Sequence, residues 1–144
     1  MSLSEHKRTA ERWLLTADGD LRAAHVLADS GMHAHACFSA QQAAEKALKG
    51  LWFWHGDDPW GHSVQKLLLD RVERDPRLTK HLEDAASLDR YYIPTRYPNG
   101  LPDLTPSDNY SAADSTDAIR RASAIVATCR ALMAEHDGQG SSPS

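Results

Sequence analysis

Apolar residues in three long stretches of this chain recur in steps of four and three, and we find no convincing strand-like alternation. Such steps return side chains to one face of an α-helix, so each stretch presents one apolar stripe to a neighbouring element. The stripes are formed by Trp13, Ala17, Leu21, Ala24 and Ala28; by Ala40, Ala44, Leu48 and Leu51; and by Ala118, Ala122, Ile125, Cys129 and Leu132. The pattern predicts an all-α fold.

Residues suited to helix termini bound these stretches. Ser4 and Asp75 are expected N-caps, Pro76 fits a first helical turn, and Gly31 and Gly56 suit the left-handed position that closes a helix. The expected helices cover about residues 4–31, 32–55, 63–73, 75–88, and 111 or 114 onward. We therefore predict an antiparallel up-and-down bundle of four main helices with a split third segment. It would occupy residues 1–136, followed by a disordered tail over 137–144 that has no apolar residue.

Composition narrows the class of protein. The chain has 144 residues, 41% of them hydrophobic, and a formal net charge of -4, whereas a protein that binds the phosphate backbone normally has a basic surplus. No apolar run approaches the roughly 20 residues that cross a bilayer, and the polar N-terminus does not resemble a secretory signal. We expect a cytoplasmic protein without membrane contact, with Cys37 and Cys129 as buried, reduced thiols.

A proline-rich and tyrosine-rich segment separates the last two predicted helices. Residues 91–110 read YYIPTRYPNGLPDLTPSDNY, and prolines at positions 94, 98, 102 and 106 exclude a continuous helix. A connection of about 20 residues is uncommon in a compact domain and is usually functional or disordered. We expect this loop to pack against the bundle.

The stretch FSAQQAAEKALKG, residues 38–50, arranges its polar side chains in rows. Gln41, Glu45 and Lys49 recur every four residues, and Gln42 and Lys46 form a second row. One explanation is a solvated helix face on which Glu45 and Lys49 form an ion pair worth a few tenths of a kcal/mol. Two other stretches, GHSVQKLL at 61–68 and LDRYYIPTRYPNG at 88–100, favour another explanation.

Together, these three segments resemble the HEPN domain, over roughly residues 10–134. The resemblance implies a small helical bundle. Related proteins of this kind act as dimeric partners of small nucleotidyltransferases and were proposed to bind nucleotides. Others in the superfamily are metal-independent ribonucleases and toxins, in which an Arg and a His separated by four to six residues meet across a dimer. That spacing occurs here from Arg74 to His81, but Asp75–Pro76 is expected to start a new helix between them.

The residues that match the family segments and carry charge or aromatic rings are the candidate site for a nucleotide or its phosphates. They are Gln42, Lys46, Lys49, His62, Tyr92, Arg96 and Tyr97. Arg96 suits phosphate because its planar guanidinium donates parallel hydrogen bonds, but it could equally pair with an acid such as Glu45. The tyrosines could stack on a base or fill space beneath the loop. The lysines could bind phosphate or remain solvated, and His62 could cap a helix, bind an anion or be exposed.

Three tryptophans raise the question of association. Trp52, Trp54 and Trp60 lie close together in the sequence, and aromatic residues are enriched at interface cores, so they are candidates for a homodimer interface or a cap over the bundle end. His33 and His35 point to different sides of a helix and lack ligand partners, so we expect no metal site.

We therefore predict a dimeric binding protein without resident cofactor or catalytic residues, acting with a nucleotidyltransferase. The alternative is a ribonuclease toxin that acts on RNA through Arg74 and His81. The first hypothesis requires the loop to fold over the second helix, so that Arg96, Lys46 and Lys49 border one pocket.

Overall fold

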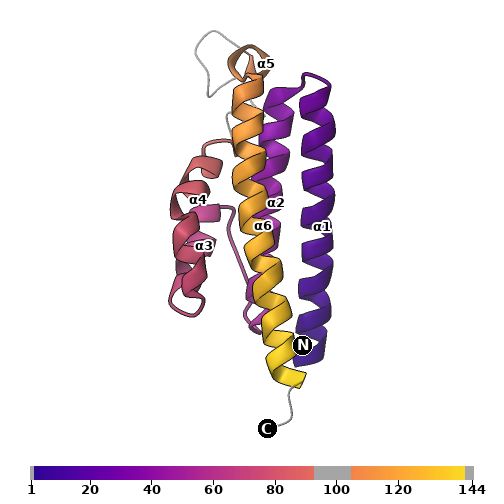
Figure 1. Cartoon of the computed structure of the whole chain (residues 1–144), viewed down its shortest axis with the longest axis vertical. Coiled ribbons are helices and arrows are strands. Elements are labelled where there is room, and N and C mark those ends of the chain that lie inside the picture. Colours follow the sequence, from indigo (N-terminus) through magenta and orange to yellow (C-terminus); the bar gives the residue numbers. More distant parts are fainter. Residues whose placement is uncertain (1, 93–104, 142–144) are drawn as a thin grey trace.

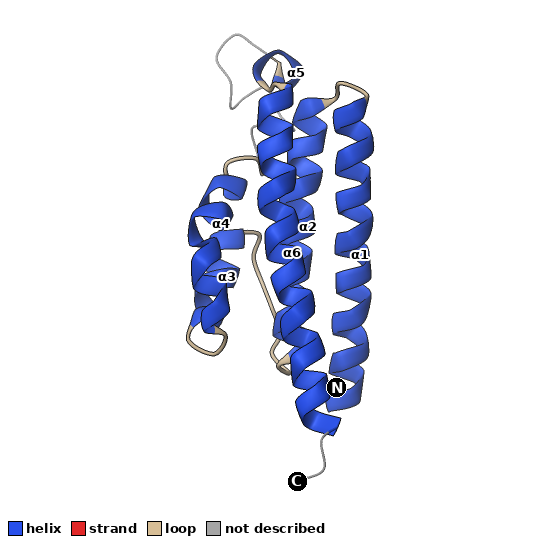
Figure 2. Ribbon diagram, viewed as in Figure 1, coloured by secondary structure: helices blue, strands red, loops and turns tan. Residues whose placement is uncertain are grey.

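The described part of this computed structural model covers residues 2–92 and 105–141, without the side chains of residues 107 and 136–141. Its helices are α1 (Leu3–Asp29), α2 (His33–Trp54), α3 (Val64–Val72), the 3-10 helix η1 (Pro76–His81), α4 (Leu82–Asp89), α5 (Pro106–Asn109) and α6 (Ala112–Ser141). These residues form helices and loops and contain no strand (Figure 2). The all-α prediction is confirmed.

Three long helices lie side by side, and a layer of shorter helices packs on one side of them (Figure 1). α1 runs in the opposite direction to α2, whereas α6 runs in the same direction as α2. Residues 55–63 return along α2, so that α3 and the η1–α4 segment form the short layer on the side away from α1. α2 packs against α1, α3, α4, α5 and α6, and therefore connects both layers.

Small residues allow the long helices to approach closely. Ala10, Ala17 and Ala24 of α1 are fully buried, and the last two belong to the predicted apolar stripe. At Gly50 of α2, an added Cβ atom would lie 3.1 Å from the Ala10 carbonyl oxygen and 3.2 Å from the terminal methyl group of Met133. The contact between α1, α2 and α6 at this point therefore depends on glycine.

The helix termini follow simple capping chemistry, with one correction to the sequence analysis. The N-cap of α1 is Ser2, not Ser4, because Glu5 lies three residues after Ser2 and completes a reciprocal capping box. The Ser2 hydroxyl accepts from the Glu5 amide at 3.2 Å, and the Glu5 carboxylate accepts from the Ser2 amide at 2.7 Å. Gly31 and Gly56 have φ values of 79° and 84°, the left-handed conformation predicted for them.

Two further expectations require correction. Asp75 occupies the N-cap position and Pro76 the first turn, as expected, but the segment begins as a 3-10 helix. The Asp75 side chain forms no capping hydrogen bond and instead lies 3.1 Å from Nε2 of the His55 imidazole. The segment 91–110 was expected to contain no helix, yet Pro106 begins the single turn α5. Proline is tolerated there because the first helical residue needs no amide hydrogen bond.

The ends of the last connection and of α6 also bear on the predicted domain. Residues 93–104, which include most of the expected loop, lie outside the described residues, and α6 is helical through Ser141, beyond the boundary expected at Asp137.

Cys37 and Cys129 are free and buried, and burial raises the pKa of each thiol to about 12. Over the described ranges, each helix is too short or too polar to cross a bilayer.

Candidate functional site

The polar row of α2 faces inward and forms a buried network. Gln41 is fully buried and Glu45 is 4% exposed. The Gln41 amide donates to Glu45 Oε1 at 3.2 Å and to the His62 carbonyl oxygen at 3.3 Å, and Lys49 donates to Glu45 Oε2 at 3.2 Å. The expected Glu45–Lys49 ion pair is therefore present, but it belongs to the interior and not to a solvated face.

The network joins α2 to the turn before α3. His62 Nδ1 lies 3.4 Å from Glu45 Oε2, and the His62 side chain is 61% exposed. The Tyr92 ring stacks on the imidazole with ring centroids 5.1 Å apart and an interplanar angle of 15°, and it also approaches Phe38 of α2. The beginning of the 91–110 segment therefore lies against the α2 side of the molecule. Gln42 joins the same network by donating to Gln41 Oε1 at 2.8 Å.

Lys46 lies on the other side of α2, facing α1. Its ammonium group is 2.8 Å from Asp20 Oδ2 of α1, and both side chains are about one quarter exposed, at 24% and 25%. Lys46 lines a groove of about 320 Å³ together with three residues of α1, Arg12, Trp13 and Thr16. The groove therefore offers two cationic groups, an indole and a hydroxyl.

Lys49 connects the groove to the buried network. Its ammonium group donates to Glu45 and lies 5.8 Å from the centroid of the Trp13 ring, which lines the groove. The Lys49 side chain is only 12% exposed. Lys49 thus holds its charge beneath the groove, whereas Lys46 presents its charge at the groove wall.

The structure divides the predicted nucleotide site between these two places. Gln42, His62 and Tyr92 lie with the buried network, Lys46 lies in the groove, and Lys49 lies between them. Arg96 and Tyr97 lie outside the described residues, so the pocket expected between Arg96 and the two lysines stays a prediction. Arg12, Trp13 and Thr16 were missed because the sequence assigned α1 only a packing role. A signal was present, because Trp13 began the apolar stripe beside the cationic Arg12.

The predicted interface tryptophans have different surroundings. Trp52 is 9% exposed, donates its indole N–H to the Leu67 carbonyl oxygen at 3.1 Å, and carries the Arg71 guanidinium 4.0 Å from its ring centroid. Trp54 is 6% exposed and Trp60 is 75% exposed. Within a single chain, the first two therefore contribute to the core, and Trp60 is available at the surface.

Of the alternative ribonuclease pair, Arg74 precedes η1 and His81 is its last residue. Arg74 is exposed in the turn after α3, whereas His81 is 5% exposed and bonded to two side chains. His81 Nε2 lies 2.8 Å from Thr128 Oγ1, and Nδ1 lies 3.1 Å from Asp84 Oδ2. His33 and His35, at which no metal site was expected, have different surroundings. His33 forms a hydrogen bond with Ser115 Oγ at 2.9 Å, and His35 is exposed.

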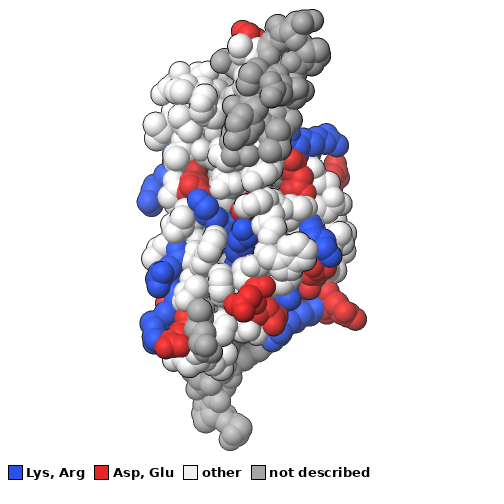
Figure 3. Space-filling model, turned by 180° about the vertical axis from the view of Figure 1, so that it is seen from behind, with Lys and Arg blue, Asp and Glu red and all other residues white. Residues whose placement is uncertain are grey.

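The described surface carries charges of both signs in close proximity. Seen from behind, Lys and Arg side chains are interspersed with Asp and Glu (Figure 3). Many cations are paired, for example Arg71 with Asp57 at 2.7 Å, which lowers the pKa of that carboxyl through the hydrogen bond from Arg71. This distribution suits a small anionic group held at one place better than a long polyanion.

Comparison with known proteins identifies relatives of the whole bundle. The HEPN domain model matches residues 10–132. The crystal structure of TT1696 from Thermus thermophilus is similar with a TM-score of 0.81 and 41% identity, covering 84% of this chain and 95% of that one. An archaeal HEPN homologue, ST0689, has a TM-score of 0.74 and 32% identity over 86% of this chain and 97% of its own.

A HEPN domain protein from Thermotoga maritima, TM0613, has a TM-score of 0.69 and 29% identity, covering 85% of this chain and 98% of that chain. Comparison with curated proteins finds no match. The similarity extends over nearly the full length of each solved structure, so it concerns the complete helical domain.

Proposed function

Because this chain belongs to the HEPN domain family, we propose that it is a binding protein that holds a nucleotide in the groove between α1 and α2, as the partner of a small nucleotidyltransferase. The observation that carries the proposal is the grouping of Arg12, Trp13, Thr16 and Lys46 around one groove. Cations, an aromatic ring and a hydroxyl are the groups that phosphate, base and ribose require.

Each lining residue has a specific task in this proposal. The Arg12 guanidinium and the Lys46 ammonium bind phosphate oxygens, and the Trp13 indole contacts the base. Thr16 donates its hydroxyl to the Arg12 carbonyl oxygen at 2.9 Å, so its oxygen remains an acceptor for a ribose hydroxyl. The volume of about 320 Å³ lies at the lower end of the range for small-molecule sites, which fits a nucleotide that is partly exposed.

Asp20 controls the charge available in this groove. In the absence of ligand it pairs with Lys46 at 2.8 Å, and a phosphate must compete with its carboxylate. Because the pair is partly exposed, its contribution to stability is small, about 0–1 kcal/mol, and its exchange for a phosphate contact is feasible. Beneath the groove, Lys49 is fixed by Glu45 and adds positive potential without moving.

The partner would perform nucleotidyl transfer with its own metal-binding carboxylates, and this chain would hold nucleotide or phosphate beside it. This division of labour requires no catalytic residue here. The chain would act as a homodimer, with Trp60 among the contacts because its side chain is exposed. Arg96 and Tyr97 lie outside the described residues and stay candidates for contact with the nucleotide.

The test is isothermal titration calorimetry of ATP with the purified chain. We expect binding that weakens about tenfold in each of the variants Arg12→Ala and Lys46→Ala, because each removes a charge-assisted contact. Lys66→Ala is the matched control, since Lys66 pairs with Asp70 on α3, away from the groove, and should leave the affinity unchanged. Absence of ATP binding, or an affinity in both groove variants equal to that of the unmodified chain, would refute the nucleotide site.

The partner is tested separately by affinity purification from the native host. We expect the tagged chain to recover a small nucleotidyltransferase. Recovery of no such enzyme from cells that express it would refute the partnership, while leaving the calorimetric result to stand by itself.

A further inference from the structure

A second, partly buried polar chain connects α6, α4 and η1, and the proposed nucleotide site does not use it. Arg121 of α6 donates to Asp84 Oδ1 of α4 at 3.0 Å. Asp84 Oδ2 lies 3.1 Å from Nδ1 of His81, and Nε2 of His81 lies 2.8 Å from Oγ1 of Thr128, back on α6. The chain therefore ends on a hydroxyl whose partner is a nearly buried imidazole.

The direction of these hydrogen bonds follows from the carboxylate. Asp84 accepts from Arg121, and a carboxylate has no proton to give to an imidazole nitrogen. The Nδ1 atom of His81 therefore carries the proton that points at Asp84, and in the neutral ring Nε2 is an acceptor. Thr128 must then donate its O–H to His81. The Thr128 oxygen can still accept a hydrogen bond from a ligand, but it cannot donate one, because its proton is already donated to His81.

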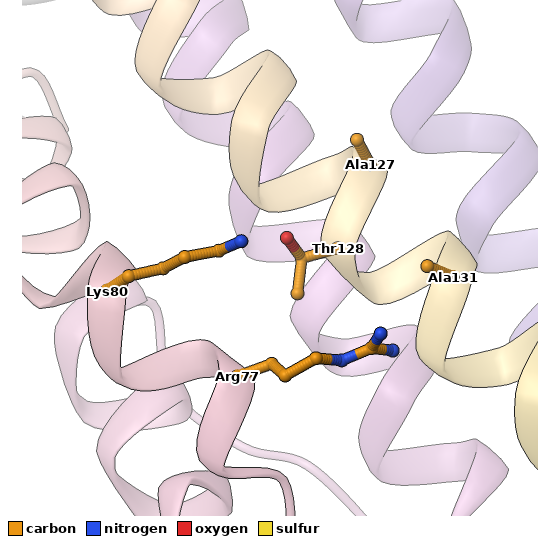
Figure 4. A pocket seen from close by; sticks show the side chains of 5 residues that line it. All are labelled: Arg77, Lys80, Ala127, Thr128 and Ala131. Atoms are coloured by element: carbon orange, nitrogen blue, oxygen red, sulfur yellow. The ribbon is translucent and has the colours of Figure 1, made fainter.

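Thr128 lines a pocket between η1 and α6. The pocket has a volume of about 190 Å³ and is lined by Arg77, Lys80, Ala127, Thr128 and Ala131. Lys80 and Arg77 reach from η1 toward α6, and the Thr128 hydroxyl points toward the Lys80 ammonium group (Figure 4). The polar lining therefore combines two cationic groups with one oriented acceptor, and two alanines form the remaining wall.

The charges around this pocket are not all positive. Arg77 forms a two-pronged ion pair with Glu135, with distances of 3.0 and 2.7 Å. Both side chains are about half exposed, at 47% and 56%, so the pair is screened by solvent and weak. Glu135 does not line the pocket, and Arg77 can donate from its guanidinium to a ligand while it keeps part of this pair.

We propose that this pocket binds a protonated oxyanion, inorganic hydrogen phosphate, through Arg77, Lys80 and the Thr128 oxygen. The two cations donate to the charged oxygens of the ion, and the one P–OH group donates to Thr128 Oγ1. His81 is a positioning residue, because it takes the hydroxyl proton of Thr128 and thereby fixes this oxygen as an acceptor.

Two physical arguments identify the ligand. The volume of about 190 Å³ lies below the roughly 300 Å³ at which small-molecule sites usually begin, so the pocket suits a single ion and not a complete nucleotide. An oriented acceptor also discriminates between ions of equal charge. Sulfate has no proton to donate and would place an anionic oxygen against the Thr128 lone pairs, whereas hydrogen phosphate matches them.

The test is calorimetric titration of the complete chain with sodium phosphate and with sodium sulfate at about pH 8, where a free imidazole is neutral. We expect phosphate to bind about tenfold more tightly than sulfate, the factor that one hydrogen bond supplies. Lys80→Ala should weaken both ions about tenfold, and Glu135→Gln should strengthen both by releasing Arg77. Lys66→Ala, on the exposed face of α3, should change neither.

The decisive variants are at Thr128. Thr128→Val removes the acceptor while keeping the shape, and should lower phosphate affinity to the level of sulfate without changing sulfate affinity. Thr128→Ser keeps the hydroxyl and should retain the preference, which separates a role in binding from a role in folding. Equal affinity for the two ions in the unmodified chain, absence of phosphate binding, or full selectivity in a folded Thr128→Val variant would overturn the proposal. The pocket shares no lining residue with the α1–α2 groove, so this site and the nucleotide groove can fail independently.

Discussion

Two of the carboxylate–histidine pairs in the described part of the chain, Glu45–His62 and Asp84–His81, differ in what surrounds them. Glu45 of α2 receives donors from Gln41 and Lys49 and lies near His62, whose side chain is 61% exposed. Asp84 of α4 receives Arg121 and bonds to His81, whose side chain is 6% exposed. In the first pair, the hydrogen bonds converge on the buried Glu45 carboxylate. In the second pair, they continue through His81 to the hydroxyl of Thr128, which lines a pocket.

This difference indicates different tasks. A buried carboxylate surrounded by an amide, an ammonium group and an imidazole stabilises the position of the segments that supply them, here the turn before α3. A chain of groups that ends at an oriented hydroxyl in a pocket retains an acceptor for a ligand. We therefore interpret the Glu45 network as structural support for the α1–α2 groove, and the Asp84 chain as part of a second binding site.

The largest expected effect is at Glu45. Glu45→Ala leaves the nearly buried Lys49 ammonium group without its carboxylate and removes an acceptor from Gln41, so the free energy of unfolding should fall by about 3–5 kcal/mol. Urea denaturation measures this change. Glu83→Ala, at an exposed position of α4, is the control and should stay within about 0.5 kcal/mol of the unmodified chain. A fall below about 1 kcal/mol for Glu45→Ala would contradict a structural role.

The two histidines provide the direct comparison. His81→Ala removes two hydrogen bonds in a nearly buried place and should cost about 1–3 kcal/mol, whereas His62→Ala, at an exposed side chain, should cost less than about 1 kcal/mol. Thermal melts of the two variants measure the order, and the reverse order would contradict the comparison. RNA cleavage without metal, abolished by His81→Ala, would instead support the ribonuclease alternative with Arg74.

Acidification should affect the Asp84 side through its neighbour Asp117. Hydrogen bonds from Arg121 and Arg120 lower the pKa of Asp117 below its value in the unfolded chain. A lowered pKa contributes stability that is fully present above the unfolded value and is lost as pH falls through the folded value. In the Asp117→Asn variant, the free energy of unfolding should therefore fall slightly less as the pH is lowered. An unchanged acid limb in a pH series of urea midpoints would show that the contribution is negligible.

The smallest effect on the stability of the single chain is expected at Trp60, which is 75% exposed. Trp60→Ala should change the free energy of unfolding by less than about 0.5 kcal/mol. In the proposed dimer, the same variant should weaken association, which sedimentation velocity over a concentration series measures. Trp60→Ala that sediments like the unmodified dimer at every concentration would exclude this residue from the interface.

The sequence predicted the helices well because their signals are local. The apolar stripes, the glycines Gly31 and Gly56, and the start of the third helix near Ser63 each depend on residues within one or two turns, and the structure contains them where expected. The N-cap at Ser2 was missed by two residues because Ser4 is also a good cap, and only the partner Glu5 distinguishes them.

The site was harder to predict because its partners are distant in sequence. The row of Gln41, Glu45 and Lys49 was recognised, but its burial depends on the segment around His62 returning across α2, which no local pattern reveals. Likewise, the separation of Lys46 from Lys49 follows from the position of α1, through Asp20 and Trp13.

A nuclear magnetic resonance titration of ATP into the isotope-labelled chain tests the proposed groove most directly, because the four tryptophan side chains report from different places. The indole N–H signal of Trp13 should shift with ATP concentration, together with the amides of Arg12, Thr16 and Lys46. The indole signal of Trp52, which is bonded to the Leu67 carbonyl oxygen, should stay in place. Shifts that avoid Trp13 and gather elsewhere in the bundle would contradict nucleotide binding between α1 and α2.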